Sequence, residues 1–499
     1  MTQRRLHPIA VALSLALTLT SSVTDARAGE SLATGGRTSV LADKALPHSP
    51  LSFLGGRLIF DAHARTRWET RENNFDFNDD LDSPTDDNWF LLRFRLGVML
   101  KPARWLKVYA QGQDAREWLS DRPDFPGQLA AEGDDTFDLR QGYIEFGDPT
   151  AFPLTLKVGR QILSYGDERL IGAFEWNNIG RTFDAVKLRW EEKKWSLDAF
   201  ASSVVVPARG QYNQSDFYNG NETDRDQTFS GLYFSTTALS FQTTDLYALH
   251  LSENSNSRFL PDAPGDTSFV TFGLRIKSKP GFFASPPGTS DGKQVADGKS
   301  MPPPPKPVGF DYDVEVAYQT GEVRGFDLTS FAVHAGIGYT LDAPWIPRLG
   351  LAYNCGSGDE DPLDREIETF QNLFPTNHKF YGQMDVFSWQ NMHDLEASIK
   401  AQPMKAVTLK AEYHAFWLAS TDEVWYRANG VTPVRPLTPA AQEASNYAGS
   451  EVDLLVQWAI TKAFTVEAGY SHFFAGDYLA NTGASDDADF GYVMATVTF

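Results

Sequence analysis

The chain has 499 residues with a formal net charge of −21, which argues against nucleic acid as a partner. Its mean hydropathy is negative, and beyond the N-terminus no segment approaches the roughly 18 to 20 apolar residues of a spanning helix, which excludes a helical membrane protein. A β-barrel is compatible with this composition, because only every second strand residue faces lipid and a closed sheet satisfies every backbone group.

The N-terminus predicts export from the cytoplasm. Arg4 and Arg5 precede an apolar run and the small-residue pattern ARA at 26–28, which together are typical of a cleaved secretory signal over residues 1–28. A buried N-terminal helix is the alternative interpretation. The apolar run is too short to span a bilayer. Residues 29–56 are then expected to form a flexible periplasmic leader.

The remaining residues, 57–499, predict an all-β protein: a single transmembrane antiparallel barrel of about eighteen strands. Each strand shows period-two alternation over about the length that a tilted membrane strand needs, and the even count suits a single-chain bacterial barrel. The predicted strands cover residues 57–68, 89–101, 104–116, 138–147, 154–161, 182–191, 194–205, 227–237, 242–252, 266–278, 309–320, 331–340, 346–355, 391–401, 404–417, 449–459, 463–474 and 489–499.

The second of these strands shows the pattern clearly. Even positions from 90 to 100 are apolar, whereas Arg93, Arg95 and Gly97 occupy the opposite face. A soluble β-sandwich shows the same alternation. Eighteen strands would then require two or more domains joined by a linker, and only one stretch of this chain has the composition of a linker.

The connections between strands favour a barrel with long extracellular loops and short periplasmic turns. If the first strand runs outward, the odd-numbered connections face outside. The long connections are 69–88, 117–137, 162–181, 206–226, 356–390 and 418–448. The exception is the Pro-rich excursion 279–308, which parity places in the periplasm as an extended segment. It is either an inert insertion or a docking or gating element.

Two loops are rich in acidic side chains. They either hold Ca²⁺ through hard oxygen ligands or form a solvated surface facing lipopolysaccharide, and neither spacing matches an EF-hand loop. No other cofactor is expected. The acidic residues are Asp79, Asp80, Asp82, Asp86 and Asp87 in one loop, and Asp359, Glu360, Asp361 and Asp364 in the other.

An eighteen-stranded barrel is wide enough for an aqueous channel, so inward side chains select what passes. An outward Arg or Lys at mid-bilayer would cost about 2 to 4 kcal/mol. Alternation therefore assigns to the pore the cations Arg65, Arg67, Arg93, Arg95, Lys107, Lys157, Lys187, Arg189, Arg275 and Lys277. Later strands point acidic residues inward, including Asp311, Asp313, Glu315, Glu396, Glu412, Asp453 and Glu467.

These charges have two interpretations. Unpaired guanidinium groups at a constriction would offer fork-like donors to carboxylates or phosphates and favour an anionic solute. Alternatively, the cations pair with acidic groups across the lumen and keep a polar interior satisfied.

Catalytic patterns are weak, because neither a Gly-x-Ser-x-Gly elbow nor a His-Glu-x-x-His helix occurs, and Cys355 is the single cysteine. We do not expect an enzyme.

Four phrases resemble the alginate-export family of bacterial outer-membrane proteins. They are GRQILSYGDERLIGAFEWNNIGRTFDAVKLRW at 159–190, FQNLFPTNHKFYGQMD at 370–385, GYSHFFAGDYLA at 469–480 and DADFGYV at 487–493. The resemblance extends from about Asp61 to Phe499. It implies an eighteen-stranded monomeric barrel, in contact with outer-membrane lipid and lipopolysaccharide, that conducts an anionic polysaccharide through an arginine-lined pore.

By the same resemblance, Arg93 and Arg160 are expected to contact the polymer. Arg160 has the opposite parity from Lys157, so a bulge would have to turn it inward. The preferred function is secretion or diffusion of an acidic polymer or its oligomers, with periplasmic secretion partners as a further expectation. The alternatives are a nutrient-uptake porin for small organic acids or oligosaccharides, and a surface barrel with a plugged lumen.

Overall fold

The computed structural model describes residues 51–81, 86–120, 135–206, 222–223, 226–254, 265–279 and 308–499. The predicted signal, most of the leader and nearly all of the Pro-rich excursion lie outside these residues. The described residues belong to one compact unit, Gly35–Phe499.

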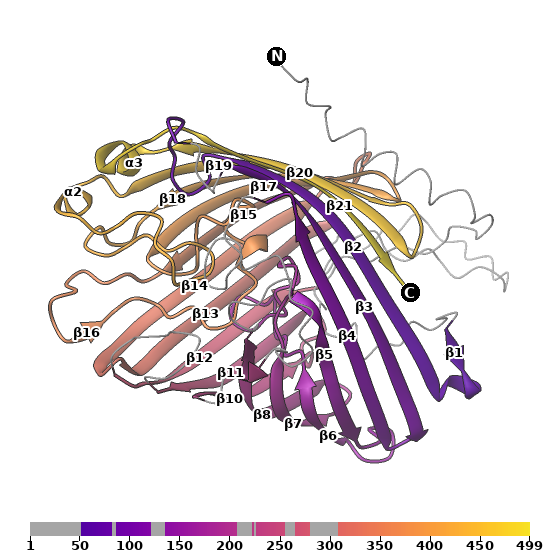
Figure 1. Cartoon of the computed structure of the whole chain (residues 1–499). Helices are drawn as coiled ribbons and strands as arrows, with labels where there is room; N and C mark the ends of the chain where they lie inside the picture. The colour runs from indigo at the N-terminus through magenta and orange to yellow at the C-terminus, as the bar shows by residue number, and fades with distance from the viewer. Residues whose placement is uncertain are drawn as a thin grey trace, which may run out of the picture. The chain divides into compact units, whose positions relative to one another are not determined.

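Eighteen antiparallel strands form a closed barrel, which confirms the predicted fold and strand number (Figure 1). Strands that follow one another along the chain pair with each other, and the ring closes where the first long strand pairs with the last, from His63↔Thr498 to Glu72↔Asp489. The barrel strands are β2 (Leu58–Glu72), β3 (Asp87–Ala103), β4 (Leu106–Trp118), β5 (Asp135–Phe146), β6 (Leu154–Gln161), β7 (Phe183–Glu191), β8 (Trp195–Val206), β10 (Gln227–Thr236), β11 (Gln242–Glu253), β12 (Thr267–Ser278), β13 (Gly309–Val323), β14 (Phe326–Thr340), β15 (Arg348–Gly356), β17 (Met392–Met404), β18 (Val407–Trp417), β19 (Tyr447–Ala459), β20 (Phe464–Ala475) and β21 (Ala488–Thr498).

Several short strands and helices lie outside the eighteen barrel strands. Within the predicted leader, β1 (Ser52–Phe53) pairs with the start of β2. Among the described residues, no helix is long and apolar enough to cross a membrane. The remaining elements are β9 (Glu222–Thr223), β16 (Glu366–Ile367), the 3-10 helices η1 (Leu54–Gly56) and η2 (Asn377–Lys379), and the helices α2 (Pro439–Gln442) and α3 (Asp477–Thr482).

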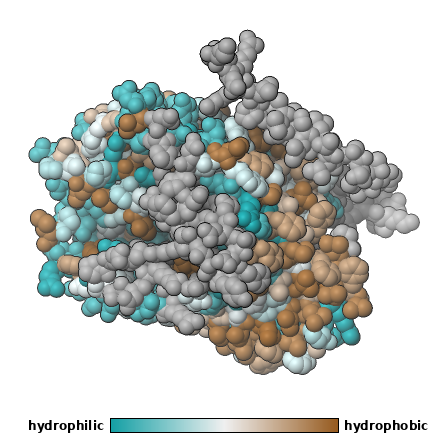
Figure 2. Space-filling model, in the orientation of Figure 1, coloured by the Kyte–Doolittle hydropathy of each residue, from teal (hydrophilic) through white to brown (hydrophobic). Residues whose placement is uncertain are grey.

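Alternation sorts the side chains into an apolar outside and a polar inside. In β3, Phe94 and Leu96 are 44% and 46% exposed on the outer face, whereas Arg93 and Arg95 are buried on the inner face. Figure 2 shows hydrophobic residues gathered over the side where Figure 1 labels β3–β6, and hydrophilic residues at the end that carries α2 and α3. Because hydrocarbon favours apolar side chains, the outer face suits a membrane.

The connections follow the predicted parity, with one further exception. The connection between β13 and β14 lies at the extracellular end but is a tight turn of two residues, Arg324 and Gly325. Both have positive φ, 56° and 81°, the backbone conformation that a two-residue hairpin turn with matching strand twist requires.

Three extracellular connections fold back and pack inside the barrel. In segments 162–182 and 357–391, Ile171 and Phe374 form a parallel bridge, and Gly172 N donates to Phe374 O at 2.7 Å. The third connection, 418–446, places Trp425 on Phe387 at 4.7 Å between ring centroids. These loops carry large apolar side chains that are buried against each other and against the inner wall, so they form a core within the barrel.

Candidate functional site

Four arginines lie close together on the inner wall. Arg65 of β2 and Arg93 of β3 are paired across the strands, and Arg95 lies one step along the same face of β3. Arg140 of β5 completes this set, which we call the arginine cluster. Like charges at such spacing repel one another, so the cluster needs acceptors nearby.

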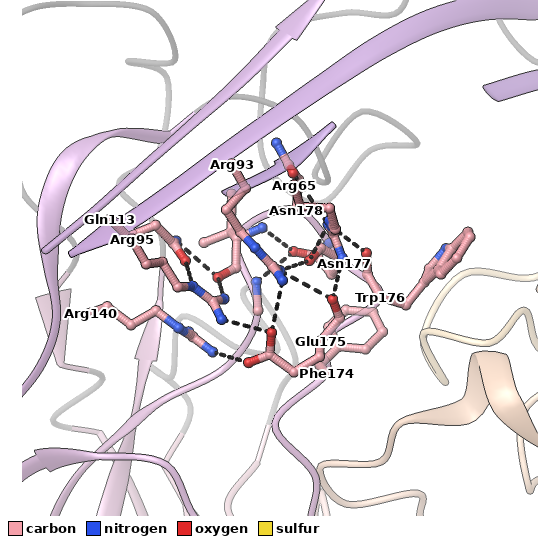
Figure 3. A network of polar contacts seen from close by, with 12 residues as sticks. Arg65, Arg93, Arg95, Gln113, Arg140, Phe174, Glu175, Trp176, Asn177 and Asn178 are labelled. Atoms are coloured by element: carbon pink, nitrogen blue, oxygen red, sulfur yellow. Dashed lines mark hydrogen bonds and ion pairs between the residues drawn. The ribbon is translucent and has the colours of Figure 1, made fainter. Parts of the chain in front are cut away.

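Segment 162–182 supplies those acceptors (Figure 3). Glu175 forms ion pairs with Arg93 at 3.0 Å, with Arg95 at 2.7 Å and with Arg140 at 3.0 Å. Arg65 reaches the segment through backbone carbonyls, donating to Glu175 O at 2.6 Å and to Trp176 O at 3.0 Å. Charge-assisted bonds of this kind hold the segment firmly against the wall.

The segment's own backbone presents these acceptors. Phe174 has φ 51°, an uncommon conformation for a residue with a bulky side chain, and its N–H donates to Thr376 Oγ1 at 3.2 Å. Asn177 Oδ1 accepts from the N–H groups of Ile179 and Gly180, both at 2.9 Å. This turn leaves successive carbonyl oxygens facing the arginine cluster.

The electrostatics of Glu175 follow from this geometry. Burial raises the pKa of its carboxyl, but Arg95, Arg93 and Arg140 together hold that pKa well below its usual range, so the group is ionised at neutral pH. The Glu175 side chain is 40% exposed, whereas those of Arg93 and Arg95 are 2% and 7% exposed. The segment therefore covers the cations and presents one carboxylate to the lumen.

Trp176, next to Glu175, packs within the lumen. Its ring lies 3.8 Å from the guanidinium carbon of Arg67 and stacks on His378 with 3.8 Å between ring centroids. Arg67 also donates to Trp176 O at 2.5 Å and pairs with Glu69. The aromatic ring thus joins the barrel wall to segment 357–391.

The other end of segment 162–182 reaches a distant part of the wall. Asp167 pairs with Arg275 at 2.8 Å and with Lys277 at 2.5 Å on β12, and Arg169 donates to Asn354 Oδ1 of β15 at 3.3 Å. Five barrel strands separate β5 from β12 in the ring. The segment therefore crosses the lumen from the β2–β5 wall to the β12–β15 wall.

The other predicted pore residues lie beside groups of opposite charge or hydrogen-bond partners, mostly on neighbouring strands. Their partners are Glu145 for Lys107 (2.6 Å) and Lys157 (3.8 Å), Asp198 for Lys187 (3.8 Å) and Arg189 (3.6 Å), Asp245 for Arg275 (3.0 Å), Asp313 for Lys277 (2.8 Å), Tyr247 for Glu315 (2.9 Å) and Lys410 for Glu412 (2.5 Å). The ion pairs therefore neutralise most of these charges locally along the wall, rather than across the lumen.

The placement of Arg160 contradicts its assignment to the pore. It pairs with Gly142 and Asp184 in regular register, so no bulge turns it inward, and its guanidinium forms an ion pair with Asp184 at 3.0 Å. Its neighbour two residues earlier, Val158, is 39% exposed on the outer face. Alternation places Arg160 on that same outer face.

The bulge occurs instead at Arg140, which the sequence prediction missed. Gln111 pairs with Gln141 but Gly112 pairs with Leu139, so Arg140 is an extra residue on β5. Strict alternation would put it on the face opposite Gln141, where lipid lies. The pairing register between β4 and β5 reveals the inward orientation of Arg140, which the alternation pattern of β5 alone does not.

The acidic loops accept hydrogen bonds from their own backbone. Asp86 accepts from Asn73 N at 2.5 Å, and Asp359 accepts from Asp361 N at 3.0 Å. Asp82 lies outside the described residues. Ca²⁺ binding by these loops stays a prediction.

Comparison with known proteins agrees with the barrel. A family model described as alginate export matches residues 57–493. Similar solved structures include the Pseudomonas aeruginosa outer membrane protein OprD (12% identity, 89% of this chain and 94% of that chain, TM-score 0.53), and OpdK with vanillate from the same organism (10% identity, 88% and 98%, TM-score 0.54). P. aeruginosa OccK11 is also similar (12% identity, 89% and 96%, TM-score 0.52). Among curated proteins, no sequence matches this chain.

Proposed function

The chain belongs to the alginate export family, and from this premise we propose that the protein, a channel of the bacterial outer membrane, conducts an anionic polysaccharide resembling alginate, or its oligomers, as a monomer. The observation that carries the proposal is the arginine cluster. Four guanidinium groups gather where segment 162–182 crosses the lumen, and three of them contact the single carboxylate of Glu175. The combined electrostatic field of the four arginines favours anions in the lumen.

The cluster acts at a distance, because its side chains are covered. Charges held away from water are screened less by salt than exposed ones, so they bias the lumen without touching the solute. Partly exposed cations supply direct contacts: Lys107, Arg189 and Lys277 have side chains 28%, 32% and 32% exposed. A carboxylate of the polymer would exchange with the protein carboxylate that each of them holds.

A second candidate is uptake of small organic acids or oligosaccharides. Two observations favour it. Segment 162–182 spans the lumen between walls that are five strands apart, which leaves less room for a polymer unless the segment moves. In addition, one structure with the same fold was solved with vanillate, a small aromatic carboxylate.

Planar-bilayer recording tests the proposal. The purified protein should pass anions in preference to cations, and oligomers of a uronic acid should block this current whereas neutral glucose oligomers of equal length should not. Cation-selective current that uronates leave unchanged would contradict the proposal. A complete lack of conductance would indicate a plugged barrel.

A deletion strain separates the two candidate functions. Loss of secreted acidic polymer with normal growth supports export. Loss of growth on an organic acid or oligosaccharide as carbon source, with polymer secretion intact, supports uptake.

A further inference from the structure

The wall opposite in charge to the arginine cluster is formed by β17, β18 and β19. Asp394 and Glu396 lie on β17, Glu412 and His414 on β18, and Asp453 on β19. His414 pairs across the strands with Glu396, and Glu412 pairs with Asp453. All five point inward by alternation. The oxygen and nitrogen atoms with which Glu396, Glu412 and His414 could hold an ion lie within 4.8 Å of one another.

His414 is oriented as metal-binding histidines are. Its Nδ1 lies 3.0 Å from Asp394 Oδ1, and the other Asp394 oxygen accepts from Asn354 Nδ2 at 2.8 Å. In the neutral ring with Nδ1 donating to Asp394, the lone pair on Nε2 is free to bind an ion. Nε2 faces Asp453 Oδ2 at 3.9 Å, and His414 is buried. A carboxylate behind a histidine fixes the ring and raises its basicity toward a metal.

Two buried oxygen atoms at this wall need either a cation or a proton shared between Glu451 and Asp453. Within the described part of the chain, Asp453 Oδ2 and Glu451 Oε2 have no hydrogen-bond partner, although both residues are fully buried. The second oxygen of each is engaged: Asp453 Oδ1 with the Ser471 hydroxyl, and Glu451 Oε1 with Met384 N at 3.0 Å. Buried carboxylates without a donor need a proton or a cation beside them.

We propose that this wall holds one divalent cation of the Zn²⁺ type, bound by His414 Nε2 with Glu396, Glu412 and Asp453, while Asp394 positions the histidine. A histidine among carboxylates suits Zn²⁺ better than Ca²⁺ or Mg²⁺, which take oxygen ligands. Three cationic groups face these ligands. Lys410 holds one Glu412 oxygen at 2.5 Å, and Lys400 and Arg348 interact with Glu412 and Glu396 respectively.

The cation would cross-link three barrel strands. Through Glu451, which accepts from Met384 N, the same wall also holds segment 357–391 in the lumen. The proposed site does not depend on which solute the channel conducts.

Calorimetry with the metal alone tests the site. The full chain, purified in detergent and treated with EDTA, is titrated with ZnCl₂, CaCl₂ or MgCl₂. We expect about one Zn²⁺ per chain, a melting temperature that rises on adding Zn²⁺, and neither effect with Ca²⁺ or Mg²⁺. No Zn²⁺ binding would overturn the proposal.

Variants locate the ion. His414→Gln should abolish binding, and Asp394→Asn should weaken it by about 10- to 100-fold. Because replacing the buried His414 could impair folding, Glu396→Gln at a half-buried position provides a second test, with the same loss expected. His393→Gln is the matched control: His393 lies on the opposite face of β17, 2.7 Å from the Tyr353 hydroxyl, and should leave binding unchanged. Unchanged binding in folded His414→Gln or Glu396→Gln protein would refute the site.

Discussion

Arg140 and Arg160 lie on the neighbouring strands β5 and β6 but face opposite sides of the wall. A bulge turns Arg140 toward Glu175, whereas regular pairing leaves Arg160 outside with Asp184. At the residue scale, a guanidinium can influence permeation only when the ladder register aims it at the lumen. The pair therefore provides an internal control for the charge of the pore.

Replacing Arg93 and Arg95 by Gln should weaken anion preference. Removing one positive charge about 10 Å from a permeating ion changes the energy of that ion by about 0.4 kcal/mol in water, unfavourably for an anion and favourably for a cation. The double variant should therefore lower the anion-to-cation permeability ratio by about 16-fold. Reversal potentials in a salt gradient measure this ratio. Arg160→Gln should keep the wild-type ratio, and an equal fall in both variants would show that the arginine cluster does not set selectivity.

Glu175→Gln should act in the opposite direction. It removes the carboxylate that three arginines contact, so the anion-to-cation permeability ratio should rise by about fourfold on the same scale. The pKa of Glu175 is held below its usual range, so this carboxylate stabilises the fold above the pKa of an unfolded glutamate and loses that effect only as pH falls through its lower folded value. Selectivity that depends on Glu175 should therefore stay constant from pH 8 to about pH 5. If the permeability ratio of the wild type changed with pH near pH 6, and this change were lost in the Glu175→Gln variant, the expectation would be contradicted.

At the element scale, segments 162–182, 357–391 and 418–446 behave as a core and not as solvated loops. Trp389 and Trp425 are fully buried among them, and the bridge between Ile171 and Phe374 ties two of them together. At the extracellular end their apolar side chains would face water, so burial in the lumen is favourable.

Removing the crossing segment should enlarge the channel. Gln161 and Phe183 are paired at the ends of β6 and β7, so a two-residue Asn-Gly turn can replace residues 162–182. Because an eighteen-stranded barrel leaves room for an aqueous lumen, single-channel conductance should rise by about twofold or more.

The matched control for this deletion keeps the crossing segment and locks it in place. Cys residues replace Ile171 and Phe374 in a chain with Cys355→Ala, so that they can form a disulfide. Bridge partners lie at the strand spacing of about 4.8 Å, within reach of a disulfide. The cross-link should leave conductance unchanged. A conductance that falls on oxidation would show that the two segments separate during permeation.

At the scale of the whole molecule, closure of the ring between β2 and β21 leaves no unpaired edge and gives every strand one lipid face and one lumen face. Leu351 of β15 is 60% exposed, beside Ile337 of β14, which is 52% exposed. Such positions form the apolar outer surface. The same barrel keeps carboxylates and guanidinium groups on its inner face.

Leu351→Arg should destabilise the barrel by about 2 to 4 kcal/mol, because it places a cation against hydrocarbon. Thr408→Arg on the inner face of β18 should cost far less, since Thr408 shares that face with Lys410 and Glu412. Denaturant unfolding of the protein refolded into lipid vesicles measures both changes. Equal destabilisation would contradict the assignment of the two faces.

Much of this architecture could be predicted from local pattern. Alternation along β3 separated Phe94 and Leu96 from Arg93 and Arg95, and the same reasoning found all eighteen strands because side-chain period depends on backbone geometry alone. The phrases at 159–190 and 370–385 also indicated the family, and the structure brings both into the lumen, where Gly172 bonds to Phe374.

The sequence by itself determined which strands exist, which face of each meets lipid, and that cations gather on the early strands. Only the tertiary structure decided that Arg140 turns inward, that Arg160 does not, that Glu175 reaches the arginine cluster, and that Asp167 anchors the far wall. Period-two alternation is a property of neighbouring residues in one strand. Ladder register and loop packing depend on contacts between residues far apart in the chain, which no local pattern encodes.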